Sequence, residues 1–201
     1  MAGREFHDGA TDGLEALEPL DPEKIHSFSE LLEAMRKTAF GGRRLGEAYE
    51  TLAAMIEDSD CKVVLTLSGA MTIAKMGKIV STMIDRGMVQ AIISTGALVA
   101  HGLSESVGKL HYRHEASHSD EELFQKGYNR VYDTLEMESN LNYVEHVVSL
   151  TLKRINTEQP LSSHLLTREL GKTLAEEFEG PGILKSAYLK NVPVYIPAFT
   201  D

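Results

Sequence analysis

Tryptophan is absent from this 201-residue chain, cysteine occurs once, and aromatic residues make up only 6% of the sequence. The single cysteine, Cys61, cannot form an internal disulfide, and its place at the start of an apolar run predicts a small buried side chain. No apolar run approaches the ~20 residues that cross a bilayer. The acidic residues that soon follow Met1 are not typical of a secretory leader. We therefore expect a cytoplasmic protein.

Basic residues are also scarce. The chain has 20 Lys and Arg against 30 Asp and Glu, which gives a formal net charge of -10 and a pI of about 5.3. This balance argues against broad binding to nucleic acid or to anionic membranes, because both attract basic protein surfaces. An acidic surface is compatible with cationic ligands such as polyamines, although it more often serves only solubility.

The start of the chain is predicted to be helical after a short leader. Residues 1–20 are polar and acidic and lack hydrophobic periodicity, which predicts a mobile leader before a domain formed by residues 21–201. The sequence at 27–30 resembles a capping box, at the start of a helix that Gly41-Gly42 would end. A second helix is expected to run to about Asp58.

Three short apolar runs, at 62–67, 89–94 and 192–196, are typical of buried parallel strands because they are rich in β-branched residues. Helical patterns at 73–85 and 97–107 follow the first two runs, as expected for right-handed crossovers in a parallel sheet. We therefore predict an α/β fold. Its core is a Rossmann-like, three-layer parallel sheet with helical additions, incomplete at its C-terminal end.

The region 119–179 is predicted to be a helical insertion between the second and third strands, with a turn at 156–159. Ser119 is expected to cap the first of its helices. Asn129 and Arg130 lie inside a helical pattern, where they would orient a loop, bridge subunits or simply face solvent.

Each of the first two strands runs into a loop of small polar residues. Ser68-Gly69 follows the first strand and Thr95-Gly96 follows the second. At the carboxyl ends of parallel strands, glycine lets backbone amides and hydroxyls approach a phosphate or a ribose. The alternative is that the glycines only form the turns and the hydroxyls only cap the following helices. Neither loop carries G-x-G-x-x-G or G-x-x-x-x-G-K-[ST], so no standard nucleotide motif applies.

Histidines form a second group of candidates. His111, His114 and His118 have the spacing H-x-x-H-x-x-x-H, and imidazoles are common metal ligands. The stretch is short and polar and lacks a strong helical pattern, so we favour a solvated or interface loop and predict no metal site. His101 follows the second glycine loop within two helical turns. It either faces a ligand in the crevice or is a hydrogen-bonded structural histidine.

Several separated motifs, in the same order along the chain, are similar to those of the deoxyhypusine synthase family. The resemblance covers about residues 60–201. The motifs are Leu65-Thr66-Leu67-Ser68-Gly69-Ala70-Met71, Met76-Gly77-Lys78-Ile79-Val80, Ile93-Ser94-Thr95-Gly96-Ala97, His101-Gly102-Leu103, Gly127-Tyr128-Asn129-Arg130 and Val192-Pro193-Val194-Tyr195-Ile196-Pro197-Ala198-Phe199-Thr200-Asp201.

The resemblance implies a homotetramer with NAD on a Rossmann-like sheet and sites between paired subunits. Such an enzyme oxidises spermidine and transfers its aminobutyl group through an imine on an enzyme lysine. The acceptor is a lysine of a translation-factor precursor or, in bacterial relatives, a small amine. The resemblance also assigns His101 to the substrate and Asp201 to the ribose of the cofactor. It implies that the NAD-binding residues are Ser68, Gly69, Ala70, Met71, Thr72, Thr95, Gly96, Ala97 and Asp201.

Two departures from the family pattern bear on function. Many eukaryotic members carry two glutamates after the second loop, one of which helps to hold the cationic amine. Here those positions are Ala100 and His101, which favours the bacterial or archaeal branch. The family's tryptophan-glycine-lysine segment, which contains the nucleophilic lysine, comes after the motif that ends at Asp201, so no catalytic residue is assigned. We expect half of a split transferase that a C-terminal chain completes, or a truncated gene product. The alternatives are a catalytically silent subunit and a different nucleotide-binding domain of shared ancestry.

Overall fold

The computed structural model describes residues 6–155 and 160–198, and the chain divides into two compact units, residues 1–61 and 62–201. In the first unit, a short 3-10 helix, η1 (Pro22–Lys24), precedes α1 (Phe28–Arg36) and α2 (Phe40–Glu57). The two α-helices pack against each other.

The sequence predicted the start of α1 and the end of α2, but not the connection between them. The side chain of Ser27 accepts a hydrogen bond from the Glu30 amide and so caps α1, as expected. The prediction that Gly41-Gly42 ends the first helix is wrong, because α1 ends at Arg36 and both glycines lie in the first turn of α2. Phe40, with a φ of 55°, makes the left-handed turn between the helices in place of glycine.

The second unit is built on a parallel sheet in the order β1-β2-β6. Its strands are β1 (Val64–Leu67), β2 (Ala91–Ser94) and β6 (Val194–Tyr195). Leu67 lies opposite Ser94, and Ile93 lies opposite Tyr195, so the carboxyl ends of the three strands meet at one edge. The predicted α/β class and the three predicted parallel strands are confirmed.

Helices connect these strands as predicted, with one difference. Two helices, α3 (Ala70–Ile73) and α4 (Gly77–Asp85), lie between β1 and β2, and α5 (Ala97–Ser106) follows β2. The single helix predicted at 73–85 is broken, because Lys75 takes a left-handed conformation with a φ of 66°. Lys75 therefore lies in the connection between α3 and α4 and is not part of α4.

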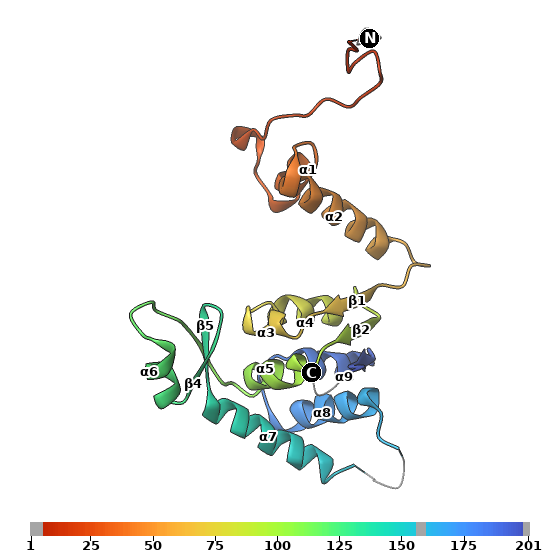
Figure 1. Ribbon diagram of the computed structural model, residues 1–201. Coiled ribbons are helices and arrows are strands. Elements are labelled where there is room, and N and C mark those ends of the chain that lie inside the picture. The colour runs from red at the N-terminus through yellow and green to blue at the C-terminus, as the bar shows by residue number, and fades with distance from the viewer. Residues whose placement is uncertain (1–5, 156–159, 199–201) are drawn as a thin grey trace, which may run out of the picture. The chain divides into compact units, whose positions relative to one another are not determined.

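The remaining long helices are α7 (Glu138–Leu152), α8 (Ser163–Glu177) and α9 (Ile183–Lys190). Helix α9 packs against α4 and α8, and α8 packs against α7, so the four helices form a continuous series (Figure 1). The largest fully buried apolar side chains of this unit are Ile84, Ile92, Leu98, Leu103, Leu170, Leu174 and Ile196.

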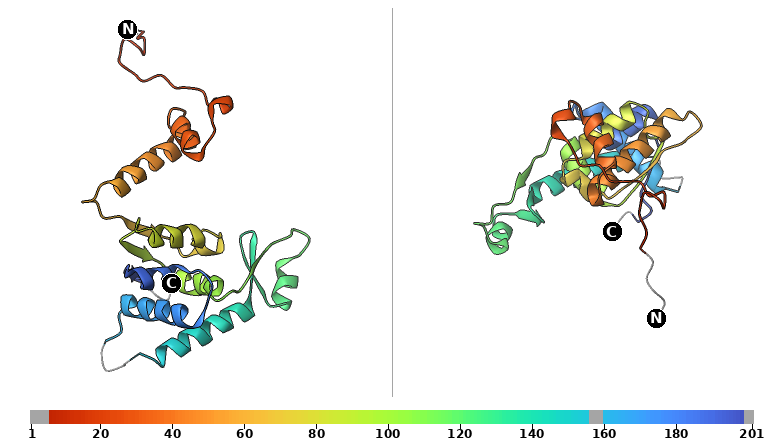
Figure 2. Two further views of the ribbon diagram at one scale, coloured as in Figure 1. Left: turned by 180° about the vertical axis from the view of Figure 1, so that it is seen from behind. Right: turned by 90° about the horizontal axis from the view of Figure 1, so that it is seen from above.

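A small antiparallel sheet interrupts the helices and projects from the second unit (Figure 2). It has the order β3-β5-β4 and consists of β3 (His111–Arg113), β4 (Tyr128–Val131) and β5 (Thr134–Met137), with α6 (Asp120–Gln125) between β3 and β4. Ser119 caps α6 in a full capping box, as expected.

The helical assignment of Asn129 and Arg130 is wrong, because both lie on strand β4. Arg130 donates two hydrogen bonds to the carboxylate of Asp120, of 2.5 and 2.6 Å, and so ties α6 to the hairpin at the surface. The turn predicted at 156–159 lies outside the described residues. Within the described parts of the chain, no helix combines the length and apolar character needed to cross a membrane.

Candidate functional site

The carboxyl ends of the parallel strands form an open hollow of about 470 Å³. This is the edge at which open α/β sheets bind their ligands. The hollow is where the sequence predicted the nucleotide crevice. Its lining residues are Thr66, Leu67, Ser68, Ile93, Ser94, Thr95, Pro197 and Ala198.

The two predicted loops are joined to each other by hydrogen bonds. The amide of Gly69 donates to Oγ1 of Thr95 at 3.1 Å, and Oγ of Ser94 donates to the carbonyl of Leu67 at 2.8 Å. Because Oγ1 of Thr95 accepts from Gly69, its own hydroxyl proton is available to a ligand oxygen. The hydroxyls of Ser68 and Thr95 both lie on exposed residues that line the hollow. This lining fits the oxygens of a ribose or a phosphate.

Position 69 requires glycine for a packing reason that the sequence did not reveal. A Cβ added at Gly69 would lie 2.2 Å from the Leu98 amide nitrogen and 2.5 Å from the Ala97 carbonyl carbon. The absent side chain therefore lets the first loop pack directly on the first turn of α5. The hydroxyl of Thr72 is likewise used inside the fold, because it is buried and donates to the Gly69 carbonyl at 2.7 Å.

The other predicted cofactor residues lie at the same edge of the sheet. Ala70 and Met71 are exposed in the first turn of α3, while Gly96 and Ala97 begin α5. Asp201 lies outside the described residues. The structure therefore brings the two loops together, with the hydroxyl groups of Ser68 and Thr95 as the side-chain groups best placed for a ligand.

His101 lies beside a buried carboxylate that the sequence analysis missed. Nδ1 of His101 is 2.5 Å from Oε2 of Glu136, and Nε2 of His111 is 3.2 Å from Oε1 of the same carboxylate. The Glu136 side chain is 1% exposed and reaches the two histidines from β5. A residue 35 positions from His101 thus becomes its partner through the small antiparallel sheet.

A lysine fixes the proton positions in this cluster. Nζ of Lys75 is 2.9 Å from Nδ1 of His111 and 3.3 Å from Oε1 of Glu105. An ammonium group can only donate, so Nδ1 of His111 accepts and its Nε2–H donates to Glu136. An ionised carboxylate can only accept, so Nδ1 of His101 carries a proton and donates it to Glu136.

The cluster holds Glu136 in its ionised form. Burial raises the pKa of Glu136, but hydrogen bonds from His101 and His111 hold that pKa far below the ordinary value of 4.5. A negative charge is therefore fixed inside the protein, one hydrogen bond away from a half-buried histidine.

The three histidines singled out by their spacing do not come together. His111 points inward to Glu136, whereas Nε2 of His114 contacts the carbonyl of His118 at 3.3 Å. A different trio, His101, His111 and Glu136, has ligand atoms within 4.8 Å of one another.

The distances from His101 and His111 to Glu136 are those of hydrogen bonds and not those between the ligands of one metal ion. Nitrogen and oxygen ligands about 2.05 Å from a tetrahedral metal lie roughly 3.3 Å apart, whereas Nδ1 of His101 is 2.5 Å from the Glu136 oxygen. Metal-bound histidines also donate their second N–H to an acceptor, and here the second nitrogen of His111 faces the donor Lys75. The trio is better suited to holding protons than to holding a metal.

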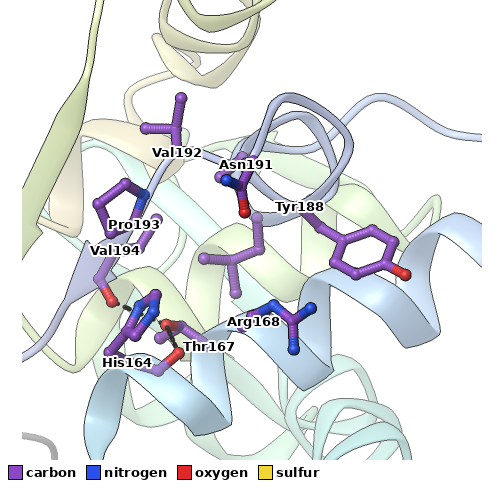
Figure 3. Close-up of a pocket in the computed structure, with 10 residues that line it drawn as sticks. His164, Thr167, Arg168, Tyr188, Asn191, Val192, Pro193 and Val194 are labelled. Atoms are coloured by element: carbon purple, nitrogen blue, oxygen red, sulfur yellow. Dashed lines mark hydrogen bonds between the residues drawn. The ribbon is translucent and has the colours of Figure 1, made fainter.

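A separate pocket of about 250 Å³ lies at the amino end of β6 (Figure 3). Thr167 of α8 donates to the Val194 carbonyl at 2.8 Å there, and Arg168 lies over the ring of Tyr188. Nδ1 of His164 is buried without a hydrogen-bond partner in the described part of the chain. None of the residues predicted to bind the cofactor or the substrate lines this pocket, which lies at the opposite end of β6 from the hollow.

Comparison with known proteins places the whole of the second unit, and part of the first, in one family. The model of the deoxyhypusine synthase family matches residues 30–201, so the similarity begins earlier than the motifs indicated. The chain is 36% identical over 187 residues to "Probable deoxyhypusine synthase 2" of Methanosarcina acetivorans, which covers 91% of this chain and 53% of that protein. It is 32% identical over 190 residues to a deoxyhypusine synthase-like protein of Elusimicrobium minutum, covering 93% of this chain and 50% of that protein.

The chain therefore spans about half the length of the curated relatives it matches. A crystal structure of a candidate deoxyhypusine synthase from Entamoeba histolytica superposes with a TM-score of 0.63 at 14% identity, covering 92% of this chain and 63% of that one. This likeness supports the fold, and the sequence matches identify the lineage: the chain belongs to the deoxyhypusine synthase family.

Proposed function

We propose that the chain forms part of an NAD-dependent transferase that moves an aminobutyl group from spermidine to a lysine side chain or a small amine. The observation that carries the proposal is the hollow at the carboxyl ends of the parallel strands, with two exposed hydroxyls in a member of this family. Ser68 and Thr95 would hold the ribose and phosphate oxygens of NAD, and the N-terminus of α5 would face its negative charge. NAD supplies the oxidising power for such a transfer when it is bound.

We also propose an oligomeric assembly, as a homo-oligomer or with a complementary C-terminal chain. The acidic surface suits a polycationic substrate such as spermidine. No catalytic lysine is assigned to the residues of this chain.

Binding of NAD tests the first part of the proposal. We expect Thr95→Val to weaken NAD binding about tenfold, because it removes both a hydroxyl donor to the ligand and the acceptor that positions the Gly69 amide. The measurement is calorimetric titration of NAD into the wild type and the variant. Thr82→Val is the matched control, since it removes a hydroxyl that bonds within α4 to the carbonyl of Lys78.

The activity is tested by spermidine-dependent formation of NADH, with the chain alone and mixed with a C-terminal half from the family. Activity only in the mixture would support a split transferase. NAD binding without activity in any mixture would favour a silent subunit. No NAD binding in any sample would contradict the transferase proposal for this chain.

A further inference from the structure

A small cavity lies among the helices of the second unit and shares no lining residue with the hollow. Residues of α3, α4, α5 and the start of α9 line it. Its volume is about 50 Å³, and one water molecule needs about 10–15 Å³ of such space, so roughly four or five heavy atoms fit. The cavity therefore has the size of a small ion and not of a whole cofactor.

Two helix N-termini meet at this cavity. Gly77 and Lys78 begin α4, residues 182–184 begin α9, and all of them line the cavity. Within the described residues, no N-cap side chain bonds to the amides of either first turn, so these amides lack the partner that a capped helix provides. Free amides and the positive end of the helix dipole both favour an anion.

Packing places the start of α9 at the wall of the cavity. A Cβ added at Gly182 would lie 2.3 Å from Oγ of Ser106, and one added at Gly180 would lie 2.8 Å from the Ser106 carbonyl oxygen. Only glycine allows this close approach, so the loop before α9 rests directly on the end of α5. The amides of the first turn of α9 are thereby held in place before a ligand binds.

The hydroxyl of Ser81 indicates that the cavity takes a polar ligand. Ser81 is 2% exposed and lies four residues after Gly77, on the face of α4 that lines the cavity. Its Oγ has no hydrogen-bond partner in the described part of the chain, whereas the neighbouring Thr82 hydroxyl donates to the Lys78 carbonyl at 2.8 Å. An unpaired buried hydroxyl is costly, so a ligand that accepts its proton would be stabilised here.

The charged side chains at the cavity determine the kind of anion. Lys78 is exposed at the cavity and forms no ion pair within residues 6–155 and 160–198. The carboxylate of Glu105 also lines the cavity, and Nζ of Lys75 contacts its Oε1 at 3.3 Å. A carboxylate repels a fully deprotonated anion but accepts a hydrogen bond from an anion that still carries a proton. The lining therefore suits an anion with one proton to donate.

We infer that the cavity binds inorganic phosphate as hydrogenphosphate. The amides at the starts of α4 and α9, the hydroxyl of Ser81 and the ammonium of Lys78 donate to its oxygens, while its P–O–H donates to Glu105. Hydrogenphosphate keeps its proton at neutral and mildly alkaline pH, whereas sulfate has none and a phosphomonoester has lost its second proton above about pH 6. The inference does not depend on the proposed function.

The test compares two tetrahedral dianions. Inorganic phosphate and sulfate are titrated into the full chain by calorimetry at pH 8, where they differ mainly by the proton on phosphate. We expect phosphate to bind with a Kd below about 1 mM and at least about tenfold more tightly than sulfate. Glycerol phosphate, a dianion without that proton, is expected to bind no better than sulfate.

Ser81→Ala tests the buried donor. We expect this variant to bind phosphate about tenfold more weakly, because a hydrogen bond to a charged ligand is lost. The substitution removes a hydroxyl that has no partner within the described residues, so the fold is expected to tolerate it. Ser104→Ala is the matched control, since its buried hydroxyl is likewise unpartnered there but does not line the cavity. This control should bind phosphate as the wild type does.

Glu105→Gln tests the acceptor that selects for the proton. An amide can donate to sulfate as well as accept from phosphate, so the preference for phosphate is expected to fall to within about twofold. The ratio of the two affinities is measured within one variant, so a general loss of stability from the broken contact with Lys75 affects both ligands alike. Only a change in recognition alters the ratio.

Competition with NAD separates the two sites. Thr72 lines the cavity and is also one of the residues that the resemblance assigns to NAD, although its hydroxyl is used inside the fold. Saturating NAD is expected to leave the affinity for phosphate unchanged, and competition would assign the cavity to the NAD site and overturn the inference. A chain that fails to bind NAD would lose the proposed function and retain the phosphate site.

Three other results would overturn the inference. No binding of phosphate would mean that the cavity holds water alone. Equal binding of phosphate and sulfate by the wild type would remove the role of Glu105, and equal losses in Ser81→Ala and Ser104→Ala would place the phosphate elsewhere. Tighter binding of glycerol phosphate than of inorganic phosphate would assign the cavity to a phosphate ester instead.

Discussion

Gly69→Ala is expected to lower the melting temperature of the second unit by about 10 °C and to weaken NAD binding with it. The added methyl group would lie 2.2 Å from the Leu98 amide nitrogen, where it meets backbone rather than a movable side chain. Overpacking of this kind costs about 3 kcal/mol, and a domain of this size loses about 3 °C for each kcal/mol. The backbone shift that relieves the clash would also break the 3.1 Å bond from Gly69 to Thr95, on which the shape of the hollow depends.

The matched control is Gly77→Ala at the start of α4. There the nearest atom to the new Cβ is Oε2 of Glu105 at 3.1 Å, the end of a flexible side chain. Alanine is also favoured over glycine in a helix by up to about 1 kcal/mol, so this variant should melt within a few degrees of the wild type. Scanning fluorimetry measures both variants. Equal melting temperatures for the two would show that the loop packing against α5 is not rigid.

Local patterns in the sequence were sufficient to predict the parallel sheet. The apolar runs before Ser68 and Thr95 contain β-branched residues and end in loops, and both became strands that meet at one edge. Ser27, Ser119 and Ser162 each cap a helix, because a serine hydroxyl is well placed to accept from the free amides of the first turn.

The β4–β5 hairpin was missed because its turn lacks the usual signal. Two-residue hairpin turns need positive φ and normally contain glycine or asparagine, but here Tyr132 takes a φ of 56° and is followed by Asp133. Without that signal, the residues from Tyr128 to Met137 resembled part of a helix. The error had a direct consequence for the site, since Glu136 lies on the unpredicted strand β5.

The partner of His101 could not be predicted from the local sequence either. Its spacing after the second loop predicted either a ligand-facing or a hydrogen-bonded histidine. The structure shows that His101 is hydrogen-bonded, to Glu136. A contact across 35 residues between a helix and a hairpin depends on tertiary packing, which no local period encodes. The Gly69 contact with α5 is of the same kind. Local sequence therefore places the loops of the site, whereas packing decides which of their atoms are available.

Glu136→Ala is expected to lower the free energy of unfolding by about 3 kcal/mol at pH 7. The substitution removes the acceptor of two buried donors, Nδ1–H of His101 and Nε2–H of His111, and each orphaned donor costs about 1–3 kcal/mol. Urea unfolding followed by circular dichroism measures the loss. Glu145→Ala is the matched control, since it removes an exposed carboxylate from α7 and should change the stability by no more than about 0.5 kcal/mol.

The pH dependence identifies the charge of Glu136 as the cause. The pKa of Glu136 is lower in the folded protein than its ordinary value of 4.5, so the unfolded chain takes up the proton first as the pH falls. The stabilisation is therefore complete above about pH 5.5 and declines steadily below pH 4.5 toward the lower folded value. The stability difference between wild type and Glu136→Ala should accordingly be smaller at pH 3.5 than at pH 7. A difference that stays constant across this range would mean that Glu136 stabilises the fold through packing alone and not through a buried charge.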